Sequence, residues 1–128
     1  MPDPKPKLLL VDDEPLVRSA LRRALKHEFD IIEAENGFEG AQHFLTDPEI
    51  RRVLSDARMP NGSGVELHRM IADQLKERDG RFVIYTGDMP AAWVDYFLSQ
   101  SVKIVDKPVD NDVIRDLFKD VKPSSRPE

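Results

Sequence analysis

The sequence predicts an α/β fold, in which five parallel strands form one doubly wound sheet with helices on both of its faces. Short apolar runs alternate five times with longer segments of helical spacing along the 128 residues. The connections between these segments are short, and repeated β–α alternation is typical of a parallel sheet with right-handed crossovers. The length suits a single domain of this kind.

The five expected strands are short apolar runs, as is usual for strands that are buried on both faces. In chain order they are Leu8–Val11, Ile31–Ile32, Val53–Leu54, Phe82–Tyr85 and Val102–Val105. The second run leads into Glu33 and Ala34, and we expect it at the margin of the sheet.

Each strand is followed by a segment with apolar residues at helical spacing. The expected helices are Leu16–Leu25, Gly37–Leu45, Val65–Leu75, Pro90–Leu98 and Val113–Val121. Pro15 fits the first position of the first helix, and Asp110 or Asn111 can cap the last one. Asn36-Gly37 and Asp79-Gly80 are pairs that typically separate elements.

Composition excludes several classes of protein. We expect the domain to cover residues 7–121, because residues 1–6 and 122–128 are rich in proline, serine and charge and resemble tails or linker stubs. The absence of cysteine excludes disulfides, thiolate zinc sites and thiol catalysis. A net charge of −5 argues against direct binding of nucleic acid. No apolar run suits a membrane span or a signal peptide, so we expect a cytoplasmic protein without membrane contact.

Polar residues follow four of the five expected strands. Asp12 and Asp13 follow the first, Asp56 the third, Thr86 the fourth and Lys107 the fifth. In open parallel sheets, ligands bind outside the carboxyl ends of the strands. We therefore expect these carboxylates, the hydroxyl and the ammonium to meet at one edge.

This set of groups suits phosphoryl chemistry. Three crowded carboxylates repel one another unless a hard cation such as Mg²⁺ (or Mn²⁺) lies among them. Lys107 and Thr86 can hold two oxygens of a phosphoryl group, and a carboxylate can attack phosphorus to form an acyl phosphate. Asp56 is the expected nucleophile because it lies on the central strand, while the pair Asp12 and Asp13 suits the metal.

These motifs resemble those of the receiver domain of two-component response regulators, the CheY-like superfamily. The matching residues are Leu10-Val11-Asp12-Asp13-Glu14-Pro15, Asp56-Ala57-Arg58-Met59-Pro60 with Gly64, Thr86-Gly87, and Lys107-Pro108. The resemblance covers about Lys7 to Val121. It implies a flavodoxin-like (βα)5 fold with strand order 2-1-3-4-5.

The resemblance also implies a function as a phosphoacceptor switch rather than an enzyme. A sensor histidine kinase or histidine phosphotransfer protein would phosphorylate Asp56, and small donors would allow self-phosphorylation followed by slow self-dephosphorylation. Mg²⁺ would be held by Asp13, Asp56 and the backbone carbonyl of Arg58, with Asp12 assisting through water. Lys107 would pair with the phosphoryl group, and Thr86 would move toward it. The face formed by the fourth strand, the fourth helix and the fifth strand would then change and control a partner.

The chain departs from the family at the position three residues before the lysine, where the family usually has tyrosine or phenylalanine. Here it is Ile104, which predicts a switch without a rotating ring. Gln100-Ser101 stands where Gly-Ala is frequent, and Val109 where an aromatic residue is frequent.

Three further expectations concern residues outside the main motifs. Trp93, Tyr96 and Phe97 make the fourth helix apolar on more than one side, which indicates a partner or homodimer surface together with the fifth strand and last helix. The three histidines have no metal-ligand spacing, and we expect them in helices at the surface or half-buried. Arg58 and Asp88 stand at the rim of the phosphate site, where a pair between them would hinder the water that hydrolyses an acyl phosphate.

Other interpretations of the same residues exist. Asp13 fits a helix cap, Asp56 a loop acid, Thr86 a strand end and Lys107 a solvated turn. A receiver-like interaction module that takes no phosphate is the main alternative function. A phosphatase of the haloacid-dehalogenase type would need Asp-x-Asp after the first strand, and a binder of flavin mononucleotide is excluded because the acids after that strand would repel its phosphate.

Overall fold

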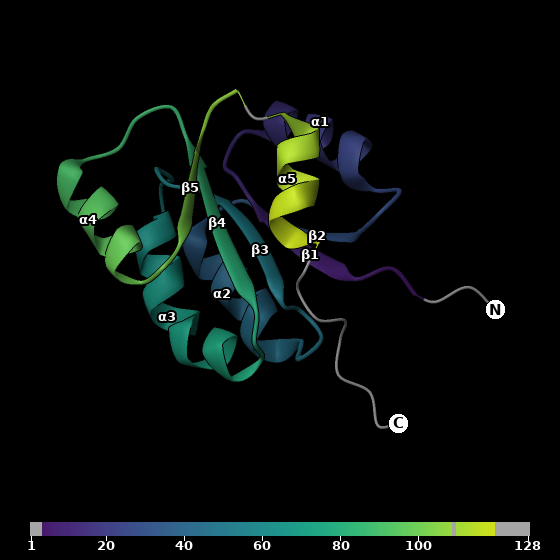
Figure 1. The fold of residues 1–128 in the computed structure, drawn as a ribbon, viewed down its shortest axis with the longest axis horizontal. Helices are drawn as coiled ribbons and strands as arrows, with labels where there is room; N and C mark the ends of the chain where they lie inside the picture. Colours follow the sequence, from purple (N-terminus) through teal and green to yellow (C-terminus); the bar gives the residue numbers. More distant parts are fainter. Residues whose placement is uncertain (1–3, 109, 120–128) are drawn as a thin grey trace.

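The computed structural model describes residues 4–108 and 110–119 and contains one sheet of five parallel strands flanked by five helices (Figure 1). The elements are β1 (Lys7–Val11), α1 (Pro15–Leu25), β2 (Asp30–Ala34), α2 (Gly37–Thr46), β3 (Arg52–Asp56), α3 (Gly64–Glu77), β4 (Arg81–Thr86), α4 (Ala91–Ser99), β5 (Lys103–Asp106) and α5 (Asn111–Phe118). The predicted fold class is therefore confirmed. The expectations for residues 1–3, Val109, Val121 and residues 122–128 lie outside the described residues, and the domain bounds stay a prediction.

The strands lie in the order β2-β1-β3-β4-β5, as predicted, with β2 at one margin of the sheet. β3 is central and pairs in parallel with β1 and β4, so that Leu54 lies between Leu10 and Val83. All five residues of β3 are buried. Because all strands run the same way, their carboxyl ends meet at one edge.

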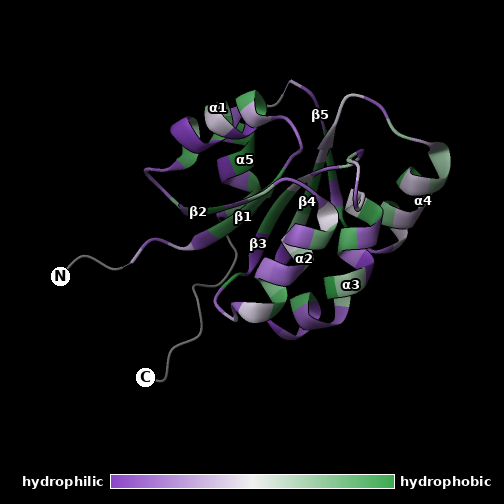
Figure 2. Ribbon diagram, turned by 180° about the vertical axis from the view of Figure 1, so that it is seen from behind, coloured by the Kyte–Doolittle hydropathy of each residue, from purple (hydrophilic) through white to green (hydrophobic). Residues whose placement is uncertain are grey.

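Alternate strand residues enter two different cores, since successive side chains point to opposite faces of a sheet. Leu8, Leu10, Leu54, Val83 and Tyr85 pack with residues of α1 and α5. The residues between them pack with α2, α3 and α4, and they include Leu9, Val11, Val53, Phe82 and Ile84. Figures 1 and 2 show these two helical layers on the two sides of the sheet, and the hydropathy colouring of Figure 2 shows the inner strands β3 and β4 as largely hydrophobic.

Side chains cap the start of α2, α3 and α5, and a proline opens α1. Glu14 is the N-cap of α1 and Pro15 its first residue, so Asp13 is not the cap. The side chain of Asn36 caps α2, Ser63 forms a capping box at the start of α3, and Asp110 caps α5. Across the described residues, no helix combines the length and the apolar character that crossing a bilayer requires.

The edge strand β5 differs from the prediction that every strand is buried on both faces. None of its four residues is buried, and Ile104 and Val105 are half-buried. β5 pairs only with β4 within the sheet, and its apolar run looked the same in sequence as that of a central strand. Periodicity alone does not distinguish an edge strand from an inner one when both runs are short.

The aromatic residues of α4 contribute to the core, and the expectation that this helix also forms a partner or homodimer surface stays a prediction. Phe97 is fully buried, and Trp93 and Tyr96 are half-buried against the core under α2 and α3. The large apolar side chain that α4 exposes is Leu98, at 63%.

His68 corrects the expectation that every histidine lies at or near the surface. It is buried on α3, its ring meets that of Phe82 edge-on at 5.0 Å, and its Nδ1 lies 2.7 Å from the hydroxyl of Tyr96. His43 is half-buried, and His27 is exposed beyond the end of α1 rather than within a helix. Burial lowers the pKa of His68 below its usual value, which favours the neutral ring, and its Nδ1 and the Tyr96 hydroxyl share a hydrogen bond.

Protonation of His68 is expected to lower the stability of the folded protein as the pH drops below about 6.5. The unfolded chain binds a proton on His68 more readily than the folded chain does, so the free energy of unfolding decreases with falling pH until the folded pKa is reached. The slope contributed by one proton is at most about 1.4 kcal/mol per pH unit. Urea denaturation between pH 7.5 and 5 should show this loss in wild type and His27→Gln. In His68→Gln it should be missing, and an equal loss there would contradict the assignment.

Candidate functional site

The carboxyl edge of the sheet brings together the polar residues that the sequence placed after its strands. Asp12 directly follows β1, Asp56 and Thr86 are the last residues of β3 and β4, and Lys107 directly follows β5. Strand alternation directs Asp12 and Asp56 toward the α1 and α5 side, since Leu10 and Leu54 point there. Neighbouring strands thus place these groups side by side, although they are far apart in the chain.

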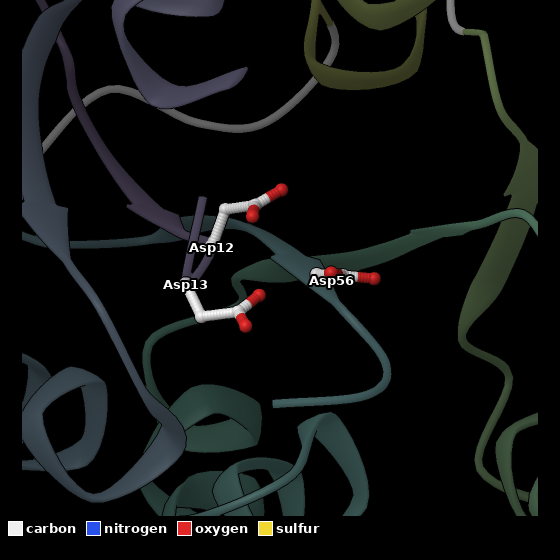
Figure 3. A group of neighbouring side chains, drawn as sticks. All are labelled: Asp12, Asp13 and Asp56. Carbon is white, nitrogen blue, oxygen red and sulfur yellow. The ribbon is translucent and has the colours of Figure 1, made fainter. Parts of the chain in front are cut away.

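Three carboxylates form the centre of the site. Asp12, Asp13 and Asp56 each offer an oxygen atom, and these atoms lie within 4.8 Å of one another. Figure 3 shows the three side chains leaving the ends of two neighbouring strands and entering the same space. Asp12 and Asp56 are buried, whereas Asp13 is half-buried.

The Asp12 carboxylate is held by donors on both oxygens. Its Oδ1 accepts the backbone N–H of Glu14 at 2.8 Å, and its Oδ2 accepts the hydroxyl of Tyr85 at 2.5 Å. The guanidinium of Arg18 donates to the backbone carbonyl of Asp12 at 2.6 Å. These contacts fix the turn between β1 and α1, because they join its first residues to α1 and to β4.

Lys107 brings a positive charge to the acids. Its Nζ lies 3.3 Å from Oδ2 of Asp56 and 3.8 Å from Oδ2 of Asp12, and it stands over the ring of Tyr85 at 5.0 Å from the centroid. The backbone N–H of Lys107 donates to the carbonyl of Thr86 at 3.0 Å, which joins the loop after β5 to the end of β4. The ammonium is therefore nearer to the central acid than to its neighbour.

The ionised form of Asp56 is destabilised, because burial removes its carboxylate from water. Burial raises the pKa of its carboxyl above the usual value, Lys107 opposes this rise, and Asp12 reinforces it. The backbone N–H of Ala57 donates to its Oδ1 at 2.8 Å. A further cation beside this carboxylate would be stabilising.

The loop after β3 leaves no room for a larger residue at Gly64. The N–H of Gly64 donates to the carbonyl of Ala57 at 2.9 Å, and a Cβ there would lie 2.8 Å from the backbone oxygen of Asp56. Asn61 and Gly62 turn the chain with φ of 61° and 112°. This tight return of the chain sets the position of the Asp56 backbone.

Thr86 and its neighbours form the rim of the site. The Thr86 hydroxyl donates to the carbonyl of Asp88 at 2.9 Å. The same carbonyl accepts Nε of Arg58 at 3.2 Å, and Nη2 of Arg58 lies 3.8 Å from the Asp88 carboxylate. The pairing of Arg58 with Asp88 that the sequence suggested is thus present, and both side chains are exposed.

Sequence reasoning missed Tyr85. It was included in the apolar run of β4, yet its hydroxyl reaches Asp12 and its ring lies beside Lys107. Burial and the Asp12 carboxylate raise its pKa far above the usual value, so the hydroxyl stays protonated and donates. The available signal was a phenol immediately before Thr86, at the end of a strand that ends in the site.

The donor set fits a hard divalent cation. Carboxylate and carbonyl oxygens are what Mg²⁺ and Mn²⁺ prefer, and Mg²⁺ is usually bound by one or two carboxylates with water completing the shell. The convergence of three acids, one of which has a raised pKa, supplies negative charge that Lys107 alone does not neutralise. Arg58, whose backbone carbonyl the sequence suggested as a ligand, lies in the loop directly after β3.

Comparison with known proteins agrees with this arrangement. Residues 8–119 match the response regulator receiver domain family. A chemotaxis protein CheY homologue of Campylobacter jejuni is 28% identical over 119 residues, which are 90% of this chain and 91% of that protein. The transcriptional regulatory protein FixJ of Rhizobium meliloti is 30% identical over 105 residues, 82% of this chain and 51% of FixJ. The crystal structure of a response regulator receiver protein from Pseudomonas putida, 28% identical, superposes with a TM-score of 0.77 over 91% of this chain and 97% of that chain.

Proposed function

This chain belongs to the response regulator receiver domain family, and on that basis we propose that it takes a phosphoryl group onto Asp56 from a histidine kinase or a histidine phosphotransfer protein. Receiver domains are signalling switches of two-component systems rather than enzymes with a substrate of their own. The finer proposal is supported above all by one observation. The carboxylate of the central strand lies 3.3 Å from the Lys107 ammonium and close to two further acids.

The residues that we propose for Mg²⁺ are Asp13, Asp56 and the backbone carbonyl of Arg58, with Asp12 acting through water. The ion would neutralise charge on the acids and on the phosphoryl oxygens. Mn²⁺ offers the same chemistry to this oxygen donor set.

In the transfer, a carboxylate oxygen of Asp56 forms a bond to phosphorus while the bond from phosphorus to the donor breaks. With phosphohistidine, the electron pair of that bond returns to the imidazole nitrogen, and the product is an acyl phosphate. Lys107 is placed to hold one phosphoryl oxygen. The Thr86 hydroxyl would have to leave the carbonyl of Asp88 in order to donate to another.

The output of the switch is proposed to be a change in the β4–α4–β5 side. A shift from almost wholly off to almost wholly on requires about 5.5 kcal/mol of differential stabilisation. Ile104 supplies no ring to rotate, so we propose that displacement of α4 carries the change. The exposed Leu98 is available there to a downstream partner or to a second copy of the chain.

A partner that delivers phosphate must also cover the site. A groove of about 610 Å³ beside Lys107 lies between α1 and the loop after β5. Leu16, 84% exposed, Val17 and Leu21 give it an apolar wall. We propose that the helix bearing the phosphohistidine docks against this wall, because the groove leads directly to the ammonium.

The test is covalent uptake of phosphate. Wild type incubated with Mg²⁺ and acetyl phosphate should gain the mass of one phosphoryl group, located on the peptide that contains Asp56, and EDTA should prevent the gain. Asp56→Ala should stay unmodified. Failure to modify wild type, or equal modification of the variant, contradicts the proposal. Dimerisation that is indifferent to Mg²⁺ and donor would instead support an interaction module that takes no phosphate.

The lifetime of the acyl phosphate is expected to depend on the pair of Arg58 and Asp88. Their contact lies at the rim of the site, where it would hinder the hydrolytic water. Replacing both with alanine should speed the loss of phosphate by up to about fivefold, the effect expected from an exposed ion pair. Decay is measured by mass spectrometry after removal of the donor. Arg115→Ala, which breaks a surface pair with Glu28 elsewhere, is the control, and unchanged or slower decay in the double variant would refute the idea.

A further inference from the structure

Tyr85 lies on the same face of the sheet as the acids and directly below them. In the register of the sheet it is the partner of Asp56 on the neighbouring strand β4, and it is 2% exposed. Its ring packs with the core under α1 and α5, whereas its hydroxyl reaches Asp12 across the sheet. A phenol in this position meets both the negative and the positive side chains of the site.

The hydroxyl supplies a donor that Asp12 needs. Asp12 is fully buried, and a buried carboxylate oxygen without a donor is costly. The backbone N–H of Glu14 donates to Oδ1 of Asp12, and the Tyr85 hydroxyl donates to Oδ2. Without the phenol, Oδ2 of Asp12 would keep the Lys107 ammonium, at 3.8 Å, as a neighbouring donor.

The Lys107 ammonium therefore has two carboxylates within reach, and its distances to them differ little. It lies 3.3 Å from Asp56 and 3.8 Å from Asp12. A hydroxyl that satisfies Asp12 reduces the attraction of that acid for Lys107. The ring of Tyr85, 5.0 Å below Nζ, adds a cation–π contact that holds the ammonium in place.

We propose that Tyr85 is a positioning residue, which satisfies Asp12 with its hydroxyl and supports Lys107 with its ring, and so keeps the ammonium on Asp56. The functional consequence of this inference rests on the proposed function, because a Lys107 ammonium beside Asp56 is what would bind a phosphoryl oxygen. The placement of Lys107 can be tested separately from phosphorylation.

The first arm of the test is NMR of the metal-free protein. A methylene next to an ammonium above an aromatic ring experiences the ring current, so the Lys107 Hε protons should be shifted upfield in wild type. The shift should persist in Tyr85→Phe, which keeps the ring, and disappear in Tyr85→Leu. Unshifted Hε protons in wild type would overturn the inference whether or not the protein takes phosphate.

The second arm is the rate of phosphorylation by acetyl phosphate with Mg²⁺. Tyr85→Phe should slow transfer by about tenfold, the lower end of what loss of one hydrogen bond to a charged group causes. Because the effect is exerted through Lys107, it should vanish when Lys107 is already methionine. Equal slowing in both backgrounds would mean a general structural effect and would overturn the proposal, as would no slowing at all.

Tyr96→Phe is the matched control. It removes the other phenolic hydroxyl, which contacts His68 between α3 and α4 rather than the acids. Its transfer rate and its Lys107 signals should equal those of wild type. If wild type itself takes no phosphate, the proposed function fails, and the NMR arm still decides whether Tyr85 places Lys107.

Discussion

Without Mg²⁺, Asp56→Asn is expected to be more stable than wild type, and with Mg²⁺ the order should reverse. Burial raises the pKa of Asp56 despite the opposing effect of Lys107, so the ionised carboxylate destabilises the folded chain above its ordinary pKa of 3.8. Asparagine removes the charge and can keep an acceptor for the N–H of Ala57. Most single substitutions lower the free energy of unfolding by about 1 kcal/mol, and we expect Asp56→Asn to raise it by a similar amount.

Mg²⁺ at a hundred times its dissociation constant stabilises a folded protein by about 2.7 kcal/mol. Wild type should show this gain, whereas Asp56→Asn lacks one of the three acids and should gain much less. Urea denaturation at pH 7 with and without Mg²⁺ measures both effects, and the metal-free advantage of the variant should shrink as the pH falls toward 3.8. A variant less stable than wild type without metal would contradict the interpretation of Asp56. Asp73→Asn, on the exposed side of α3, is the control.

Lys107→Met is expected to slow phosphorylation of Asp56 by about 10²–10³-fold, the usual cost of removing one donor that stabilises developing charge. The ammonium lies 3.3 Å from the Asp56 carboxylate, at the place where a phosphoryl oxygen would arrive. The same substitution should tighten the binding of Mg²⁺, because it removes a positive charge that competes for Asp56 and Asp12. The two effects have opposite signs.

This opposition separates loss of function from loss of structure. A misfolded variant would lose both properties, whereas the expected variant binds Mg²⁺ more tightly and accepts phosphate more slowly. Isothermal titration calorimetry gives the affinity, and mass spectrometry gives the rate. Lys103→Met, at the exposed start of β5, should change neither. Weaker Mg²⁺ binding in Lys107→Met would contradict the competition inferred from the two distances.

The sequence alone determined the alternation of strands and helices and the residues at the strand ends, and its resemblance to receiver domains implied the strand order. Its strand–helix alternation and its resemblance to receiver domains predicted the sheet, and Pro15 opens α1 and Asp110 caps α5 as the sequence predicted. It also predicted that Asp12, Asp13 and Asp56 would meet, because parallel strands bring their carboxyl ends to one edge. These predictions succeeded because they depend on local patterns and on topology.

Only the tertiary structure decided which apolar residues face the core and which polar contacts they make. His68 and Phe97 are buried and no residue of β5 is, because burial depends on what packs against an element rather than on its own pattern. The hydroxyl of Tyr85 finds Asp12 73 positions away in the chain. No spacing rule encodes such a pair, since the register of β1, β3 and β4 brings the two together only after the sheet has formed.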